Sequence, residues 1–152
     1  YCGNFGCLET VASNAAIEQR VRNLLNQGYQ SKLTLDDCSI SAICKAANKG
    51  DELAINVIEL VGRYLGRGIS MAINLFNPQK VVITGDIAEA EKTLLAAIQS
   101  CIDTQVLINF RKDLPVVVSQ LDHRSAIGSF ALVKRSMLNG VLLQHLLGDN
   151  ND

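Results

Sequence analysis

Concentrated positive charge is missing from this sequence of 152 residues. Its 14 lysines and arginines nearly balance 15 aspartates and glutamates, and the formal net charge is −1. Nucleic-acid backbones attract proteins through clustered positive charge, whereas the basic residues of this sequence are spread along it. We therefore do not expect this chain to contact nucleic acid directly.

A long apolar run is missing as well. The most strongly apolar stretch, residues 69–76, falls far short of the roughly 20 residues that a membrane-spanning helix needs. No segment with a charged start followed by an apolar run precedes it, so the sequence shows no secretory leader. These absences predict a cytoplasmic protein without membrane insertion.

The residue groups of common catalytic sites are also scarce. Only two histidines are present, His123 and His145, and their neighbours favour structural roles at a helix entry and on a short apolar helix. No serine, histidine and acid triad, no glycine-rich phosphate loop and no paired catalytic carboxylates can be assembled. With 48% apolar residues the chain can bury one ordinary core, but we do not expect it to be an enzyme.

Five cysteines are present, an odd number that argues against a disulfide framework. Cys44 and Cys101 lie among apolar neighbours in helix-like stretches, where a cysteine is usually a small buried hydrophobe. Cys2 and Cys7 are separated by glycines that would let both thiolates point at one metal ion. An incidental glycine-rich loop is the alternative, and a closed zinc site would need two further ligands.

Apolar spacing and capping residues predict a helix-dominated α/β fold. Gly62, Gly66 and Gly68 weaken the longest helix, which is understandable if another element packs closely there; close approach of a ligand is the alternative. Two short β-branched runs alternate with helices and predict parallel strands, and because two strands are too few for a sheet alone, we expect an exposed edge or one covered by a second copy. The predicted elements are a helical turn at 8–12, helices at 14–27, 39–48, 51–76, 89–102, 125–138 and 141–147, buried strands at 80–84 and 116–119, and polar loops at 29–37 and between 102 and 116.

The first residues also carry a family resemblance. The run Cys-Gly-Asn-Phe-Gly-Cys-Leu-Glu at positions 2–9 resembles the C-x-C-G-x-x-G-C-x-E signature of the ROK family, which contains sugar kinases and sugar-sensing repressors. The segments 73–80, 121–128 and 142–147 resemble the repressor branch. The resemblance implies that residues 1–148 are the carboxy-terminal part of a sugar-sensing domain, a partial actin-like, ribonuclease-H-like lobe, followed by a polar tail at 149–152.

The resemblance assigns roles to three residues near the start. Cys2 and Cys7 would be zinc ligands in the intact protein, with a third cysteine just before Tyr1 and a histidine further upstream. Glu9 would contact the sugar, because a carboxylate can accept two hydroxyl protons. The alternative for Glu9 is that its charge merely stabilises the start of a helix.

The turn after the first predicted strand separates the two branches of the family. ROK kinases have a glycine cluster there, where nucleotide phosphates need bare backbone. This chain has Gly85 followed by Asp86, and a carboxylate repels a polyphosphate, which indicates a degenerate nucleotide site. A single glycine after a strand is more often a plain turn.

The resemblance therefore implies the effector-sensing and oligomerisation portion of a transcriptional repressor of amino-sugar uptake and catabolism genes. The expected effector is N-acetylglucosamine 6-phosphate, the expected assembly is a homo-oligomer, and operator DNA would be bound only through a missing amino-terminal domain. One alternative is the carboxy-terminal part of a ROK kinase for N-acetylglucosamine or glucose. Another is a purely structural dimerisation module.

Overall fold

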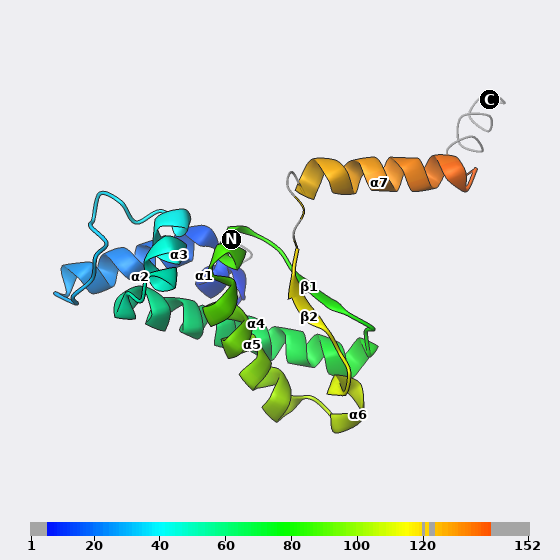
Figure 1. Ribbon diagram of the computed structural model, residues 1–152, viewed down its shortest axis with the longest axis horizontal. Coiled ribbons are helices and arrows are strands. Elements are labelled where there is room, and N and C mark those ends of the chain that lie inside the picture. Colours follow the sequence, from blue (N-terminus) through cyan, green and yellow to red (C-terminus); the bar gives the residue numbers. More distant parts are fainter. Residues whose placement is uncertain (1–5, 120, 122–123, 141–152) are drawn as a thin grey trace. The chain divides into compact units, whose positions relative to one another are not determined.

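The structure is a computed structural model that describes residues 6–119, 121 and 124–140. It divides into two compact units, Tyr1–Ser119 and Gln120–Asp152, which are described separately. The elements in chain order (Figure 1) are α1 Glu9–Ala12, α2 Asn14–Asn26, α3 Ile40–Asn48, α4 Glu52–Phe76, β1 Val81–Ile83, the 3-10 helix η1 Asp86–Ala90, α5 Glu91–Gln105, α6 Ile108–Arg111, β2 Val116–Val118 and α7 Arg124–Leu138.

Side-chain caps begin the three helices for which the sequence predicts them. The Ser13 hydroxyl accepts a hydrogen bond from the Ala16 N–H at the start of α2, and the Ser39 hydroxyl does the same for α3. The Asp51 carboxylate accepts from the Ala54 N–H at 3.0 Å and begins α4. Each such cap satisfies a donor that the helix itself cannot pair.

Asp51 is an unusual cap because its side chain is buried. Burial opposes its ionisation, but hydrogen bonds from the Lys32 N–H, the Ala54 N–H and the Ser31 hydroxyl outweigh burial and lower the pKa of Asp51. The Ser31 and Lys32 bonds also attach the loop after α2 to the start of α4. A buried carboxylate with this many donors is stable in its charged form.

The long helix α4 packs closely against α5. A Cβ atom built on Gly62 would lie 2.7 Å from the Cβ of Ala97, and one on Gly66 would lie 2.8 Å from the Cβ of Cys101. The predicted close approach is therefore confirmed for these two glycines. The prediction is wrong for Gly68. A Cβ atom built on Gly68 would lie 3.8 Å from the nearest atom, in Leu8, which is an ordinary contact distance.

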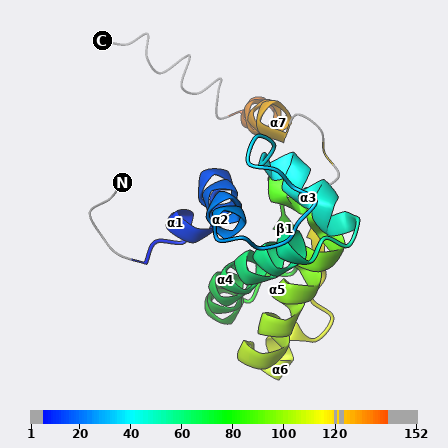
Figure 2. The same ribbon diagram turned by 90° about the vertical axis from the view of Figure 1, so that its left-hand side faces the viewer.

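The core of the first unit lies where α2, α3, α4 and α5 meet, and α1 and α2 pack against α4 (Figure 2). Cys44 and Cys101 are buried, as predicted. The largest fully buried side chains are Ile17, Ile43, Ile58, Ile73, Leu94, Ile98, Ile102, Val21, Val57, Val61, Cys38 and Cys44.

Within residues 6–119 the sheet consists of two parallel strands, β1 and β2, with Val81 opposite Val116. The predicted helix-dominated α/β class with two parallel strands is confirmed. The prediction that β1 is buried is wrong, because Val82 is 53% exposed. Side chains alternate along a strand, so Val81 and Ile83 pack on the core while Val82 points to the other face.

Two helical turns are missing from the sequence prediction. η1 precedes α5 in the region where a single helix is expected from residue 89, and α6 interrupts the predicted loop after α5. Both are only one or two turns long, which is too short to produce an apolar periodicity.

In the second unit, α7 matches the predicted helix within one residue. The predicted helix at 141–147, the polar tail, His123 and His145 lie outside the described residues. None of the helices in the described part of the chain is long and apolar enough to cross a membrane.

Candidate ligand site at the α1–α2 corner

The α1–α2 corner begins with a tight turn at Cys7. The N–H and the hydroxyl of Thr10 both donate to the Cys7 carbonyl, at 3.0 and 2.6 Å. Gly6 has a φ of +78°, a conformation that favours glycine. The chain therefore turns directly from the cysteine motif into α1.

Glu9 lies in the first turn of α1 and is exposed. It lines an open hollow of about 410 Å³ together with Thr10, Ser13, Ala15 and Ala16. A solvent-accessible carboxylate at the wall of a hollow can accept hydrogen bonds from two hydroxyl groups of one ligand. The geometry is compatible with the predicted sugar contact, and it leaves the helix-stabilising role of Glu9 equally open.

The predicted metal ligands are only partly described. The Cys7 side chain is half-buried, next to the corner, whereas Cys2 lies outside the described residues. Over residues 6–119, 121 and 124–140, no three histidine, cysteine, aspartate or glutamate side chains gather as a metal site would require. Zinc binding through Cys2 and Cys7 remains a prediction, because it needs residues beyond these.

Gly85 is the predicted degenerate nucleotide turn, between β1 and η1. Its φ of +118° explains the glycine, since any side chain would strain this backbone, although a Cβ atom built there would have no neighbour within 4 Å. The next residue, Asp86, is exposed and has a distant hydrogen-bond partner. Its carboxylate accepts a hydrogen bond of 2.8 Å from the side-chain amide of Asn14, 72 positions away.

Sequence reasoning missed Asn14 and the bonds that attach η1 to α3. The Ser41 hydroxyl donates to the Glu89 carboxylate at 3.0 Å, and the Asn48 amide donates to the Glu89 carbonyl at 2.9 Å. The buried Cys44 thiol lies 3.8 Å from the carbonyls of Asp86 and Ile87. Burial, with a further contribution from the Glu89 charge, raises the pKa of Cys44 to about 11, so the thiol stays protonated and can donate.

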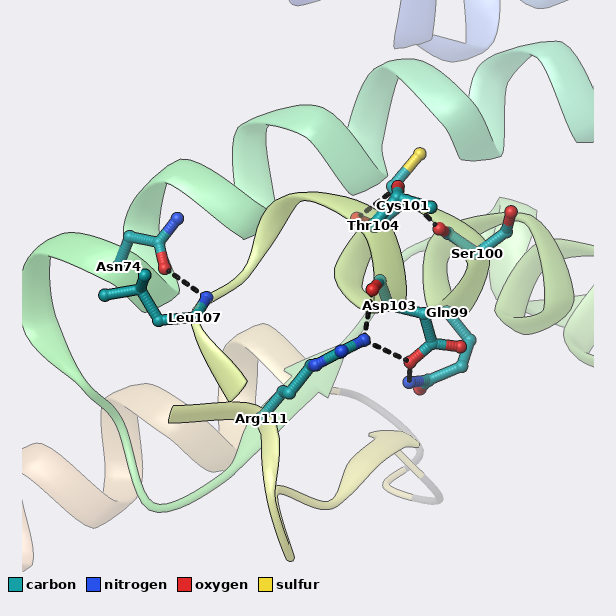
Figure 3. Close-up of polar contacts among 8 residues, drawn as sticks. All are labelled: Asn74, Gln99, Ser100, Cys101, Asp103, Thr104, Leu107 and Arg111. Atoms are coloured by element: carbon teal, nitrogen blue, oxygen red, sulfur yellow. Dashed lines mark hydrogen bonds and ion pairs between the residues drawn. The ribbon is translucent and has the colours of Figure 1, made fainter. Parts of the chain in front are cut away.

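A second hollow, of about 660 Å³, lies at the α5–α6 corner and is lined by residues 103–111. Its polar groups are engaged with one another (Figure 3). Asn74 accepts from the Leu107 N–H at 3.1 Å, and Arg111 forms an ion pair of 3.7 Å with Asp103, which also accepts from Gln99. These contacts attach the loop between α5 and α6 to the ends of α4 and α5.

Comparison with known proteins identifies a family. The model of the ROK family matches residues 1–136. The DNA-binding transcriptional dual regulator NagC of Escherichia coli is 74% identical over 97% of this chain, and a glucokinase of Halalkalibacterium halodurans is 33% identical over 70% of it. The match covers 36% of NagC and 34% of the glucokinase, so the chain spans about a third of these relatives.

A solved structure shares the fold. The crystal structure of a ROK family transcriptional regulator, described as a homologue of the Escherichia coli MLC protein, superposes with a TM-score of 0.88. It is 44% identical, and the match covers 94% of this chain and 36% of that one.

Proposed function

Because this chain belongs to the ROK family, we propose that it is the effector-sensing and oligomerising portion of a transcriptional repressor of amino-sugar uptake and catabolism genes. The 74% identity to a DNA-binding regulator supports this proposal. The observation that carries it is the exposed carboxylate of Glu9 in a hollow directly after the cysteine motif. We use "full-length protein" for the longer protein of which this chain would be a part.

The proposed effector is N-acetylglucosamine 6-phosphate. Glu9 would accept hydrogen bonds from the sugar hydroxyls, and charge-assisted bonds of this kind are stronger than neutral ones. The rest of the pocket, including the groups that recognise the phosphate, would come from other parts of the full-length protein. The effector can shift the repressor between states only as far as it prefers one state over the other.

Cys2 and Cys7 would hold a zinc ion together with two ligands from other parts of the full-length protein. A half-buried thiol beside a tight turn suits a structural zinc site, because thiolates are preferred zinc ligands. The ion would contribute rigidity to the α1–α2 corner. Within this proposal the thiols orient Glu9 and take no part in chemistry.

The proposal assigns no enzymatic activity to the chain. The Asp86 carboxylate next to Gly85 would repel nucleotide phosphates, and Asn14 holds it in place. The runner-up function is the corresponding part of a ROK sugar kinase, which the identity to a glucokinase favours. Saturable binding of ATP with phosphoryl transfer to a sugar would decide for the kinase.

Operator binding would belong to an amino-terminal domain of the full-length protein, since the net charge of this chain is −1. The chain would contribute a surface for homo-oligomerisation. A transcriptional repressor must reach the DNA that it regulates, and we therefore propose that the protein is cytoplasmic.

The test is calorimetric titration of the full-length protein with N-acetylglucosamine 6-phosphate. Glu9→Gln should weaken binding about 10- to 100-fold, because it removes the charge from the accepting group. Glu52→Gln is the matched control, since Glu52 is an exposed glutamate in the first turn of another helix, α4. Unchanged affinity in Glu9→Gln, with an intact oligomer, would favour the structural dimerisation module instead.

A further inference from the structure

Glu9 and Asn14 belong to one short, hydrogen-bonded corner. The Ser13 N–H donates to the Glu9 carbonyl at 3.2 Å, which closes α1, and the Ser13 hydroxyl caps α2. Asn14 follows as the first residue of α2. A single residue, Ser13, therefore separates the helix that carries Glu9 from the helix that begins with Asn14.

The side chain of Asn14 connects this corner to η1. Its Nδ2 atom donates to Oδ2 of Asp86, the first residue of η1, at 2.8 Å. Both side chains take part in an exposed contact. An exposed hydrogen bond contributes little net free energy, so this bond can form in one state and break in another without unfolding the protein.

The helix α3 is attached at two other points. Glu18 of α2 accepts a hydrogen bond of 3.0 Å from the Ile40 N–H at the start of α3. On its other side α3 binds η1 through Ser41 and Asn48, which donate to the side chain and the carbonyl of Glu89. The elements α2, α3 and η1 are therefore connected pairwise by hydrogen bonds, and of the residues that make these bonds Asn14 is the closest to Glu9 in the sequence.

We propose that the Asn14–Asp86 hydrogen bond couples effector binding at Glu9 to the position of η1 and α3. Asn14 and Asp86 are positioning residues, which do not touch the effector. The inference rests on the proposed function of Glu9. It adds the route by which effector binding at Glu9 affects other elements of the fold.

Exchanging the two side chains tests the coupling. Asn14→Asp places two carboxylates against each other and breaks the bond, whereas Asp86→Asn leaves an amide oxygen that can still accept. The double variant Asn14→Asp with Asp86→Asn reverses the donor and acceptor, restores the bond and keeps the net charge of the wild type. Asp86→Ala removes the acceptor without introducing repulsion, in case Asn14→Asp is poorly folded.

A charge control lies on the same helix. Gln19 of α2 makes an exposed hydrogen bond to Asn23 within the helix. Gln19→Glu therefore adds the same charge to α2 as Asn14→Asp but breaks no bond between elements. Thermal melting of every variant separates loss of coupling from loss of stability.

Two measurements on the full-length protein follow: the dissociation constant for N-acetylglucosamine 6-phosphate, and hydrogen–deuterium exchange of residues 40–48 and 86–90 with and without this ligand. Asn14→Asp and Asp86→Ala should change the dissociation constant about 2- to 10-fold and abolish the ligand-dependent change in exchange. The double variant should return both readouts to wild-type values, a non-additivity that marks a direct interaction. Gln19→Glu should behave as the wild type.

Wild-type affinity and a wild-type exchange response in Asn14→Asp and Asp86→Ala would overturn the coupling while leaving the role of Glu9 intact. Equal effects of Asn14→Asp and of the double variant would also overturn it, because added charge at position 14 would then explain the result. If the wild-type protein does not bind the sugar phosphate, the proposed function fails and the coupling fails with it.

Discussion

Replacing three glycines of α4 by alanine should change the free energy of unfolding in opposite directions. Gly62, Gly66 and Gly68 lie within two turns of one helix, and in each case alanine should gain about 1 kcal/mol of helix propensity. The three positions differ in the space that a new methyl group would find. Their comparison therefore isolates the packing of α4 against α5 from the propensity of the helix itself.

At Gly62 the methyl group would meet the Cβ of Ala97 at 2.7 Å and the Leu94 carbonyl oxygen at 3.3 Å. At Gly66 it would meet Cys101 at 2.8 Å and the Cα of Ile98 at 3.2 Å. Overpacking of this kind costs about 1–3 kcal/mol, and these neighbours are backbone or short side chains that cannot swing away. After subtracting the propensity gain, we expect each variant to lose up to about 2 kcal/mol.

Gly68→Ala should instead gain up to about 1 kcal/mol, because its nearest neighbour lies at 3.8 Å. Equilibrium unfolding in urea, followed by circular dichroism, measures all three. Gly62→Ala combined with Ala97→Gly should recover part of the loss, since the second change removes the atom that clashes. Stabilisation by Gly62→Ala and Gly66→Ala to the same extent as by Gly68→Ala would refute the close packing of α4 on α5.

Three further outcomes follow from buried groups. Ile58→Ala should cost about 2–5 kcal/mol in urea unfolding, because the Ile58 side chain is fully buried and its removal leaves a cavity. The pKa of Asp51 is lower in the folded chain than in the unfolded chain, where it is near 4. The charge of Asp51 therefore stabilises the fold above about pH 4, and this contribution is lost as the pH falls through the lower pKa of the folded state. Asp51→Asn should flatten the acid dependence of stability below about pH 4. Cys44, with a pKa of about 11, should resist alkylation at pH 8 until urea unfolds the chain, and labelling at the rate of a free thiol would contradict its burial.

Local signals in the sequence predict much of this fold. Ser13, Ser39 and Asp51 are capping residues directly before apolar periodic segments, and each one begins a helix as expected. The β-branched runs around Val82 and Val117 form the two strands for similarly local reasons. α6 escaped prediction because one turn carries no periodicity.

Contacts between distant segments could not be predicted in the same way. The bond between Asn14 and Asp86 joins positions 72 residues apart, and nothing near either residue in the sequence signals the other. Asp86 could be recognised only as a charge beside Gly85, and Glu9 only as the end of a cysteine motif. Glu9 lines a hollow because α1 and α2 meet at a corner. This corner depends on the packing of both helices against α4, a distant segment of the sequence.

We propose that this chain senses an amino-sugar phosphate on behalf of a DNA-binding domain. The most direct measurement is the affinity of the full-length protein for an operator duplex selected in vitro, determined by fluorescence anisotropy with and without N-acetylglucosamine 6-phosphate. We expect the sugar phosphate to weaken operator binding, and we expect Glu9→Gln to bind DNA normally but no longer to respond at the same concentration. Operator binding that is identical with and without saturating sugar phosphate would contradict it.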